Sequence, residues 1–403
     1  MRALADLVAS RGHTVSGSDA GLGGHAAHNV DGCDLVVYTN AVPKDNCELA
    51  RARRLGIPII ERAAYLGEIS HTYDKVIAVA GCHGKSTATA MLGAAFETRD
   101  PTVHMGVAGS SKVGSNKYFI TEACEYRRSF LKLKPDVGII LNIKYDHPDF
   151  YRNNDELLGA YSAFAAQCKT LIVNGDDDAC AFLRKDAFTF GTGEHCDYRA
   201  VDIKTENGYR SFTLAGGRCP AIRLSVAGGH NVYNALAALA AAKLCGLAAS
   251  ECVPKLNAFC GIPRRFERKG LAFGKTIFTD YAHHPDEIAA TIKTAREIFP
   301  SVAVVFQPHT YSRTQSLMDG FVKALSLADT VVVAPIFAAR EQPIEGVSSH
   351  SLCRELLKQK ENAYCFDTFS EIVSFCKSLK EKAVIFTGAG DIDKAADIMI
   401  ACD

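Results

Sequence analysis

The sequence has no excess charge of either sign, because its 403 residues hold 45 Lys and Arg against 45 Asp and Glu. That balance excludes the basic surplus typical of nucleic-acid-binding proteins, so no nucleic-acid partner is expected. No apolar run approaches the ~20 residues of a bilayer-spanning helix. The first ten residues include Asp6 and do not resemble a signal peptide. We therefore expect a cytoplasmic protein without a membrane partner.

Cysteine is plentiful, but no Cys-x-x-Cys pair occurs among the 15 cysteines. Cysteines scattered in this way indicate buried or surface thiols in a reducing cytosol rather than a disulfide framework.

Strand-like apolar runs alternate with helix-like segments, which predicts an α/β fold with parallel sheets. A length of 403 residues suggests two to three domains of roughly 100–200 residues each. We expect three, over residues 1–73, 74–263 and 264–403. Helices are expected at residues 2–9, 47–55, 157–167 and 232–244. Strands are expected at 13–16, 35–38, 57–60, 76–80, 118–121, 137–141, 170–174, 276–279, 302–306, 330–334 and 383–387.

A glycine-rich loop follows the apolar run at 76–80 and precedes a helical segment, which is the context that a phosphate-binding loop requires. Glycines let the backbone approach phosphate, and a helix N-terminus offers unpaired N–H groups. Lys85 can bridge the outer phosphates of ATP, and the Ser86 hydroxyl can hold Mg²⁺. Val79 stands where the longer Walker pattern has glycine, so a turn that merely contains lysine is the alternative. The expected nucleotide-binding residues here are Gly81, Cys82, His83, Gly84, Lys85, Ser86 and Thr87.

Polar residues also follow other predicted strands. Glu122 ends the strand at 118–121, and His147 lies beyond the strand at 137–141. The carboxyl ends of parallel strands face a shared crevice, so both side chains could reach Mg²⁺ beside the loop. Asn231 and Asn234 lie three residues apart at the start of a helix, where their amides suit a purine edge. Capping of that helix by Asn231 is the alternative.

The last third of the sequence contains three polar clusters, two of them just after predicted strands. They are Arg264-Arg265-Phe266-Glu267, Asp280-Tyr281-Ala282-His283-His284-Pro285 and Gln307-Pro308-His309-Thr310-Tyr311-Ser312-Arg313. A single histidine is most often incidental, whereas this concentration of Asp, His and Arg indicates a site.

Together these motifs resemble the Mur ligase family. The matching stretches run in family order across almost the whole chain, at Gly81–Thr87, Glu122–Leu131, Asn142–Tyr151, Gly229–Asn234, Arg264–Glu267, Asp280–Pro285, Phe306–Thr314 and Ala338–Ser348. The resemblance implies a truncated Rossmann-like N-terminal domain that binds the UDP end of a substrate. It further implies a central ATP-binding, phosphate-loop ATPase-like α/β domain and a C-terminal Rossmann-like domain that binds an amino acid and closes over the site.

The resemblance also implies residue roles, carried over by matching position. Lys85 would contact ATP phosphates, with Ser86, Glu122 and His147 serving Mg²⁺. Asn231 and Asn234 would face adenine, and Arg265 and Asp280 would bind ATP. The expected substrate residues are Ser18, Asp19, Tyr281, His283, His284, His309 and Arg313. The expected catalytic set is Lys85, Glu122, His147, Arg265 and His283.

The implied activity is ATP-dependent joining of L-alanine to UDP-N-acetylmuramate in peptidoglycan precursor synthesis, by a monomer or homodimer. ATP would convert the carboxylate into an acyl phosphate, which the alanine amine then attacks. Mg²⁺ and Lys85 would stabilise the developing phosphoryl charge, and domain closure would exclude water.

The sequence departs from the family pattern at three places. The chain begins at the helix after the usual first strand and glycine-rich turn, so we hypothesise a start further upstream and expect the apolar face of this helix to be exposed. Cys124 and residues 126–128 replace acidic or small residues, and Cys82 replaces threonine. The Cys82 thiol is either packed or, at a helix N-terminus, reactive. The alternative functions are a nucleotide-binding protein inactivated by the missing turn, and a ligase for murein peptides or another amino acid.

Overall fold

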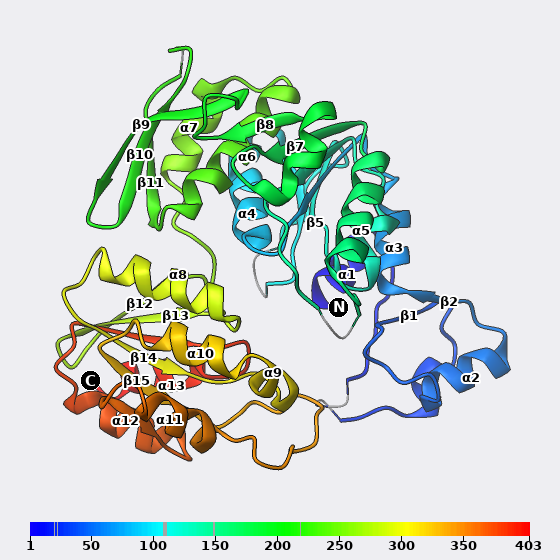
Figure 1. The fold of residues 1–403 in the computed structure, drawn as a ribbon. Coiled ribbons are helices and arrows are strands. Elements are labelled where there is room, and N and C mark those ends of the chain that lie inside the picture. Colours follow the sequence, from blue (N-terminus) through cyan, green and yellow to red (C-terminus); the bar gives the residue numbers. More distant parts are fainter. Residues whose placement is uncertain (20, 22, 108–110, 148–149, 218) are drawn as a thin grey trace. The chain divides into compact units, whose positions relative to one another are not determined.

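The computed structural model describes residues 1–19, 21, 23–107, 111–147, 150–217 and 219–403. The chain forms two compact units (Figure 1). The first holds residues 1–201, 213–221 and 233–256, and the second holds residues 202–212, 222–232 and 257–403. Each unit is α/β, as the alternating sequence pattern predicts.

Six strands of a nine-stranded sheet lie parallel at the centre of the first unit, in the order β8-β7-β6-β3-β5-β4. The chain places β4 and β5 on one side of β3 and places β6 on the other, so the strand order reverses at β3. Ligand crevices of open α/β sheets form at the carboxyl ends of strands at such a reversal. The strands are β3 (Lys75–Ala80), β4 (Thr102–His104), β5 (Tyr118–Glu122), β6 (Val137–Ile140), β7 (Thr170–Asn174) and β8 (Phe188–Gly191).

Burial on both faces explains the continuous apolar sequence of β3. Every residue of this strand after Lys75 is buried. Phe130, Tyr161 and Phe164 pack in one cluster with Ala78. Two of these rings belong to α5 (Asn154–Gln167). Asn153 caps this helix, and its side chain accepts a hydrogen bond from the Glu156 N–H. The strand that leads into the phosphate loop is therefore held inside a packed core.

The N-terminal helix of the first unit, α1 (Arg2–Ala9), buries its apolar face. Leu4 and Leu7 are 3% and 2% exposed and belong to a cluster with Leu66 and Phe119. The expectation that this face would be exposed is wrong, because α3 (Arg62–Ser70) and β5 supply the apolar surface that covers it.

Two short strands accompany this helix, and one expected strand does not form. β1 (Val36–Tyr38) pairs in parallel with β2 (Ile59–Glu61). Between them, α2 (Cys47–Leu55) is capped by Asn46 and ends at Gly56, which has φ +70°. Residues 13–16, predicted as a strand, are exposed and belong to no described sheet, so they lack the neighbour that a strand needs.

The second unit contains a six-stranded sheet in the order β12-β13-β17-β14-β15-β16, parallel except for the β12–β13 pair. Alternate residues of β14 (Val302–Phe306) enter two different core clusters, as the two-residue period of a strand requires. Val304 packs with α8 (Pro285–Arg296), α10 (Met318–Leu325) and α11 (Ser349–Leu357). Val305 packs with α12 (Phe369–Ser378) and α13 (Asp393–Ala401). The other elements are β12 (Glu267–Ala272), β13 (Lys275–Asp280), α9 (Tyr311–Ser316), β15 (Thr330–Val333), β16 (Ala363–Cys365) and β17 (Ala383–Thr387).

The chain passes between the units in the stretch that holds β9 (Tyr198–Glu206), β10 (Tyr209–Leu214), β11 (Ile222–Ala227), α6 (His230–Leu244) and α7 (Ala249–Asn257). β10 and β11 pair antiparallel. The remaining helices are α4 (Lys85–Ala95) and the 3-10 helices η1 (Ala27–Val30), η2 (Glu97–Arg99), η3 (Tyr126–Lys132) and η4 (Asp178–Asp186).

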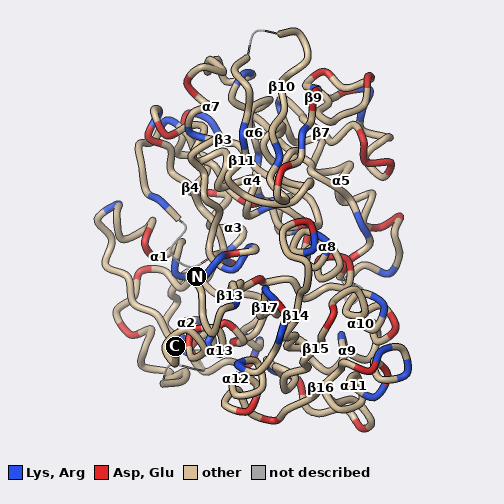
Figure 2. Tube along the Cα trace, turned by 90° about the vertical axis from the view of Figure 1, so that its left-hand side faces the viewer, with Lys and Arg blue, Asp and Glu red and all other residues tan. Residues whose placement is uncertain are grey.

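Acidic and basic residues are interspersed along the trace (Figure 2), for example on α8, which carries Asp286 and Glu287 in its first turn and Lys293 and Arg296 in its last. All fifteen cysteines are free thiols. In the part of the chain that the structure describes, every helix is too short or too polar to cross a bilayer.

Candidate active site

The phosphate loop runs from the buried end of β3 into α4 and takes its shape from two glycines. Gly81 has φ +140°, and a Cβ placed on it would lie 3.1 Å from the Leu141 Cβ. Gly84 has φ +84°, and a Cβ there would lie 2.8 Å from Asn234 Oδ1. Only glycine accepts both the left-handed backbone and this close approach. The loop therefore leads directly into the N-terminus of α4.

Asn142, directly after Leu141 at the end of β6, holds the middle of this loop. Its Oδ1 accepts a hydrogen bond from the His83 N–H at 2.9 Å, and its Nδ2 donates to the His83 carbonyl at 3.0 Å. The Cys82 N–H also donates to the Asn142 carbonyl. Sequence analysis placed Asn142 in a motif without assigning it a role, because the pairing joins residues 59 positions apart.

Lys85 points back into the loop and pairs with Glu125, a residue that sequence analysis missed. Lys85 Nζ lies 2.9 Å from Glu125 Oε2 and 3.2 Å from Oε1. It also donates to the carbonyls of Gly81 and Cys82. Glu125 is 1% exposed. The sequence offered one hint of this role: Glu125 lies three residues after Glu122, in the segment where Cys124 and residues 126–128 depart from the family pattern.

The charges of this buried pair stabilise each other. Burial would raise the pKa of Glu125, but the Lys85 ammonium, followed by a hydrogen bond from His147, lowers it to about 2. Burial would lower the pKa of Lys85, but the Glu125 carboxylate raises it above its usual value. Both groups are therefore charged at neutral pH.

His147 lies beside the same carboxylate. Its Nε2 is 3.5 Å from Glu125 Oε1 and 3.8 Å from Asp146 Oδ2. The His147 backbone has φ +57°, and its ring lies 4.7 Å from the Tyr126 ring. Glu125, Asp146 and His147 each offer one ligand atom, and these three atoms lie within 4.8 Å of one another, so the cluster could hold a metal ion. Residues 148 and 149 of the predicted motif lie outside the described residues.

Glu122 is the last residue of β5, and one of its carboxylate oxygens accepts no hydrogen bond from the described residues. Its Oε1 is buried and has no hydrogen-bond partner among the described residues. A buried, unpartnered carboxylate oxygen is costly unless a cation or donor completes it, so Glu122 fits a magnesium ligand. Ser86, in the first turn of α4, is 8% exposed, and Thr87 follows it on the same helix.

Cys82 is a packed thiol. It is 9% exposed, its Sγ donates to the Lys144 carbonyl, and the Lys144 N–H donates to it at 3.0 Å. Burial, with a contribution from the Glu125 charge, raises the pKa of Cys82 to about 12. Of the two alternatives for this cysteine, the structure has the packed one.

The two asparagines predicted to face adenine are buried near the start of α6. Asn231 donates from Nδ2 to the Ala227 carbonyl at 2.7 Å, so its side-chain amide links the helix to the end of β11. Asn234 borders the phosphate loop, because a Cβ placed on Gly84 would lie 2.8 Å from its Oδ1. Between them, Tyr233 donates to Asp176 Oδ2 at 3.0 Å, which fixes the helix start against the loop after β7.

In the second unit, Asp280 ends β13 and organises its surroundings. Its carboxylate accepts from the Phe266 and Ala282 N–H groups at 2.8 and 2.7 Å. Burial raises its pKa, which the Arg265 charge partly offsets. The Arg265 guanidinium lies 5.2 Å from the Tyr281 ring.

Two histidines, His283 and His309, lie close to each other near the carboxyl end of β13. His283 Nδ1 lies 3.0 Å from the Tyr281 carbonyl, and its ring is 6.0 Å from that of His309. His309 lies 3.3 Å from an Arg313 nitrogen. Burial lowers the pKa of His283, and burial together with Arg313 lowers that of His309 to about 4. His284 instead caps α8 by accepting from the Asp286 N–H, which is a structural contact.

The predicted substrate residues of the N-terminal segment are tied to other side chains. Ser18 Oγ donates to Glu48 Oε2 at 2.7 Å and lies 3.2 Å from His25 Nδ1. Asp19 Oδ1 accepts from the Gly21 N–H. Residues 20 and 22 lie outside the described residues.

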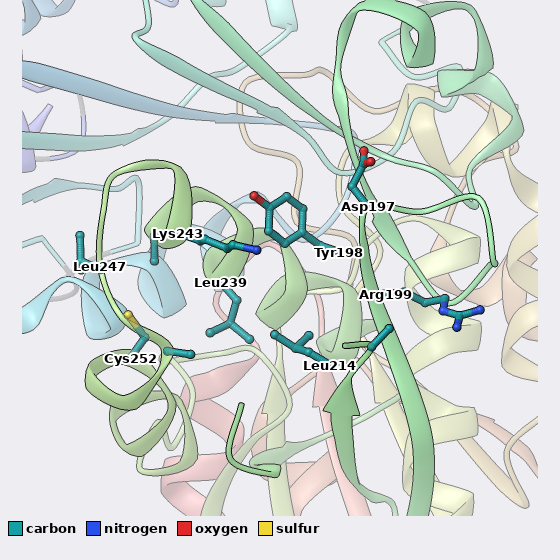
Figure 3. A pocket seen from close by; sticks show the side chains of 11 residues that line it. Asp197, Tyr198, Arg199, Leu214, Leu239, Lys243, Leu247 and Cys252 are labelled. Carbon is teal, nitrogen blue, oxygen red and sulfur yellow. The ribbon is translucent and has the colours of Figure 1, made fainter. Parts of the chain in front are cut away.

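A separate cavity of about 90 Å³ lies at the C-terminal half of α6 (Figure 3). Lys243 and Tyr198 point toward one another there, with Lys243 Nζ 5.1 Å from the ring centroid. Leu214 and Leu239 line the apolar side. Lys243 is nine residues beyond Asn234, about 14 Å along a helix, so this cavity is distinct from the phosphate loop.

Most of the predicted site residues thus form two groups, and Ser18, Asp19, Asn231 and His284 make the other contacts described above. The phosphate loop, Glu122, His147 and Asn234 come together in the first unit. Arg265, Asp280, Tyr281, His283, His309 and Arg313 come together in the second.

A lysine held inside a glycine-shaped loop between strand and helix, on a parallel sheet, defines an α/β protein of the phosphate-loop nucleotide-binding class. Three family models match successive parts of the chain. They are "Mur ligase family, catalytic domain" at residues 1–74, "Mur ligase middle domain" at 79–242 and "Mur ligase, glutamate ligase domain" at 264–390. The chain therefore belongs to the Mur ligase family and has its three-domain α/β organisation.

Individual relatives agree with this placement. The UDP-N-acetylmuramate–L-alanine ligase of Caldicellulosiruptor saccharolyticus is 37% identical over 99% of this chain and 96% of its own length. The crystal structure of the UDP-N-acetylmuramate–alanine ligase of Thermotoga maritima matches with a TM-score of 0.81 and 29% identity, over 94% of this chain and 87% of that one. A MurF ligase of Thermotoga maritima, solved with ADP, shares the fold at a TM-score of 0.68 and 16% identity, over 91% of this chain and 94% of that one.

Proposed function

We propose that this protein joins L-alanine to the carboxylate of UDP-N-acetylmuramate with conversion of ATP to ADP and phosphate, in the cytoplasm, as a step of peptidoglycan precursor synthesis. The observation that carries the proposal is Lys85, whose side chain is only 16% exposed in its phosphate loop, within a chain 37% identical to such a ligase over 99% of its length. The domain boundaries 1–73, 74–263 and 264–403 and an assembly no larger than a dimer are parts of this proposal.

The first unit supplies the phosphoryl-transfer residues. The α4 N-terminus and the loop N–H groups receive phosphate oxygens, and Lys85 places a positive charge among them. The substrate carboxylate oxygen attacks the γ-phosphorus, the bond to the ADP oxygen breaks, and an acyl phosphate forms. Lys85 stabilises the charge that develops on the phosphoryl oxygens in this step.

Magnesium is the metal that suits this site. Ser86, Glu122 and His147 are the proposed ligands, and the unpartnered Glu122 Oε1 supports the fit. When bound, Mg²⁺ neutralises phosphate charge and orients the reacting oxygens. Asn231 and Asn234 face the adenine in this proposal.

The second unit supplies residues for the amino acid. Arg313, beside His309, offers a cation for the alanine carboxylate, and the low pKa values keep His283 and His309 neutral at pH 7. A neutral imidazole can accept the proton that the alanine amine loses as it attacks the acyl carbon and phosphate departs. Arg265 and Asp280 bind ATP, and His284 and Tyr281 border the amino acid. Ser18 and Asp19 border the UDP-linked substrate.

Phosphate release tests the proposal directly. The purified chain is incubated with ATP, Mg²⁺, UDP-N-acetylmuramate and one amino acid at a time. We expect phosphate release with L-alanine and a product heavier than UDP-N-acetylmuramate by one alanine residue. ATP binding without release would indicate an inactive nucleotide-binding protein. Release only with a peptide, or with another amino acid, would assign a different acceptor and overturn the proposal.

A further inference from the structure

We propose that Glu125 is a positioning residue, which holds the Lys85 ammonium within the phosphate loop before ATP binds and competes with the ATP phosphates for it. The effect on turnover rests on the proposed function, whereas the effect on ATP affinity does not.

The first argument is that the protein already saturates the Lys85 ammonium. Its Nζ contacts both Glu125 oxygens and the carbonyls of Gly81 and Cys82. An ammonium has three N–H donors, so four acceptors leave no donor for a ligand. A phosphate oxygen can bind Lys85 only if one of these contacts, and above all the charged one, lengthens or breaks.

The second argument concerns charge. The Glu125 side chain is 2% exposed, so water screens its charge poorly. Phosphate oxygens bound at the loop carry charge of the same sign, and like charges repel more strongly where water is excluded. Glu125 therefore stabilises the nucleotide-free enzyme and weakens the binding of the nucleotide phosphates. Removal of its charge should tighten ATP binding.

The third argument is that the backbone around Glu125 is fixed. The Tyr151 hydroxyl donates to the Glu125 carbonyl at 2.6 Å, and the Arg128 N–H donates to it at 2.8 Å. The next turn holds Arg127 and Arg128 at φ +52° and +56°, a region that side chains other than glycine adopt only when their surroundings enforce it. A segment held in this way gives the carboxylate one position.

The fourth argument is that one carboxylate serves two functional side chains. Glu125 Oε1 lies 3.2 Å from Lys85 Nζ and 3.5 Å from His147 Nε2. Loss of the carboxylate should therefore disturb the placement of both groups, so turnover should fall while ATP affinity rises. A residue with only a structural role would lower both together.

The test compares the full chain with Glu125→Gln and with the control Glu97→Gln. Glu97 also pairs with a lysine, at 2.8 Å from Lys255 Nζ, but this pair is exposed. Calorimetry gives the Kd of ATP without Mg²⁺, and phosphate release gives kcat and KM for ATP. We expect Glu125→Gln to bind ATP roughly 3- to 10-fold more tightly, as for loss of one repelling charge. Its kcat should be at least ~10-fold lower. Glu97→Gln should match the wild type.

A second variant covers the case in which Glu125→Gln does not fold, since a buried lysine left alone is costly. Glu125→Asp keeps the charge but draws it back by one methylene. We expect ATP binding tighter than wild type and a kcat between those of wild type and Glu125→Gln. Unchanged or weaker ATP binding in the folded variants would overturn the role of Glu125. If the wild type binds ATP but ligates nothing, the proposed function fails, and the ATP affinities still decide the role of Glu125.

Discussion

At the scale of single residues, the site depends on a few charges and thiols whose behaviour is set by burial. Lys85 and Glu125 are both charged because each lies 2.9 Å from the opposite charge, which outweighs the effect of burial. Cys82 is uncharged because burial, followed by the nearby Glu125 charge, raises its pKa. The phosphate loop therefore contains a charged side chain, Lys85, and an unreactive thiol, Cys82. Each of these properties can be tested separately.

Lys85→Ala should abolish turnover. We expect kcat to fall by at least ~10²–10³-fold, the size found when one charge-stabilising donor is lost. Phosphate release measures this, with Lys255→Ala, an exposed lysine, as the control. Lys85→Ala leaves the buried Glu125 carboxylate without its partner. The double variant Lys85→Met with Glu125→Gln should therefore melt at a higher temperature than Lys85→Ala, and it should still be inactive. Normal kcat in Lys85→Ala would refute the assignment of the loop.

Cys82 should resist alkylation in the folded protein. With a pKa of about 12, its thiolate amounts to about one part in 10⁴ at pH 8. Iodoacetamide should modify the exposed Cys47, Cys260 and Cys402 first. Peptide mass spectrometry before and after unfolding in urea gives the order of modification. Rapid labelling of Cys82 in the native protein would show that the thiol is accessible.

At the scale of elements, the phosphate loop relies on the left-handed turn at Gly84, which places the α4 N-terminus beside Asn234. Gly84→Ala should weaken ATP binding about 10-fold or more, since a left-handed alanine costs roughly 1–2 kcal/mol and its Cβ would meet Asn234 Oδ1. The matched control is Gly159→Ala within α5, where a Cβ meets nothing within 4 Å. This control should bind ATP normally and gain about 0.5–1 kcal/mol of stability. Equal ATP affinity in the two variants would contradict the loop geometry.

Most elements could be predicted from sequence, because their patterns are local. The run Val76–Ala80 is apolar throughout, and α2 carries its own cap and stop at Asn46 and Gly56. Residues 13–16 look like a strand, yet a strand depends on a neighbour that the sequence does not identify. The burial of Leu7 depends likewise on α3, some 60 residues away.

The candidate site could be predicted in part, for the same reason. The loop was found because strand, glycines and lysine are adjacent in sequence. The partner of Lys85 was not, because Glu125 is 40 residues away and resembles any surface glutamate. The roles proposed for Asn231, Arg265 and the histidines remain predictions. Local signals identify the phosphate loop, and packing decides which carboxylate completes it.

At the scale of the whole molecule, half-buried neutral histidines make stability depend on pH. The folded-state pKa of His309 is about 4, below the ~6.5 of an unfolded histidine. Between these values the unfolded chain binds more protons, so the free energy of unfolding falls as pH drops from about 6.5 to 4. His309→Gln should flatten this part of the profile. Urea unfolding at several pH values, with the exposed His350→Gln as control, measures the difference. An unchanged slope would contradict the lowered pKa of His309 in the folded protein.

The Asn142 side chain, with its two hydrogen bonds to the backbone of His83, closes the middle of the phosphate loop into a ring. A ring of this kind acts like the cyclisation of a flexible peptide, since it removes conformations that an open loop would sample in the absence of a ligand. The loop backbone would then need little reordering when ATP binds, even though Lys85 must exchange a contact, and little ordering entropy would be lost on association. The association rate should accordingly be set by diffusion and charge rather than by a slow rearrangement of the loop.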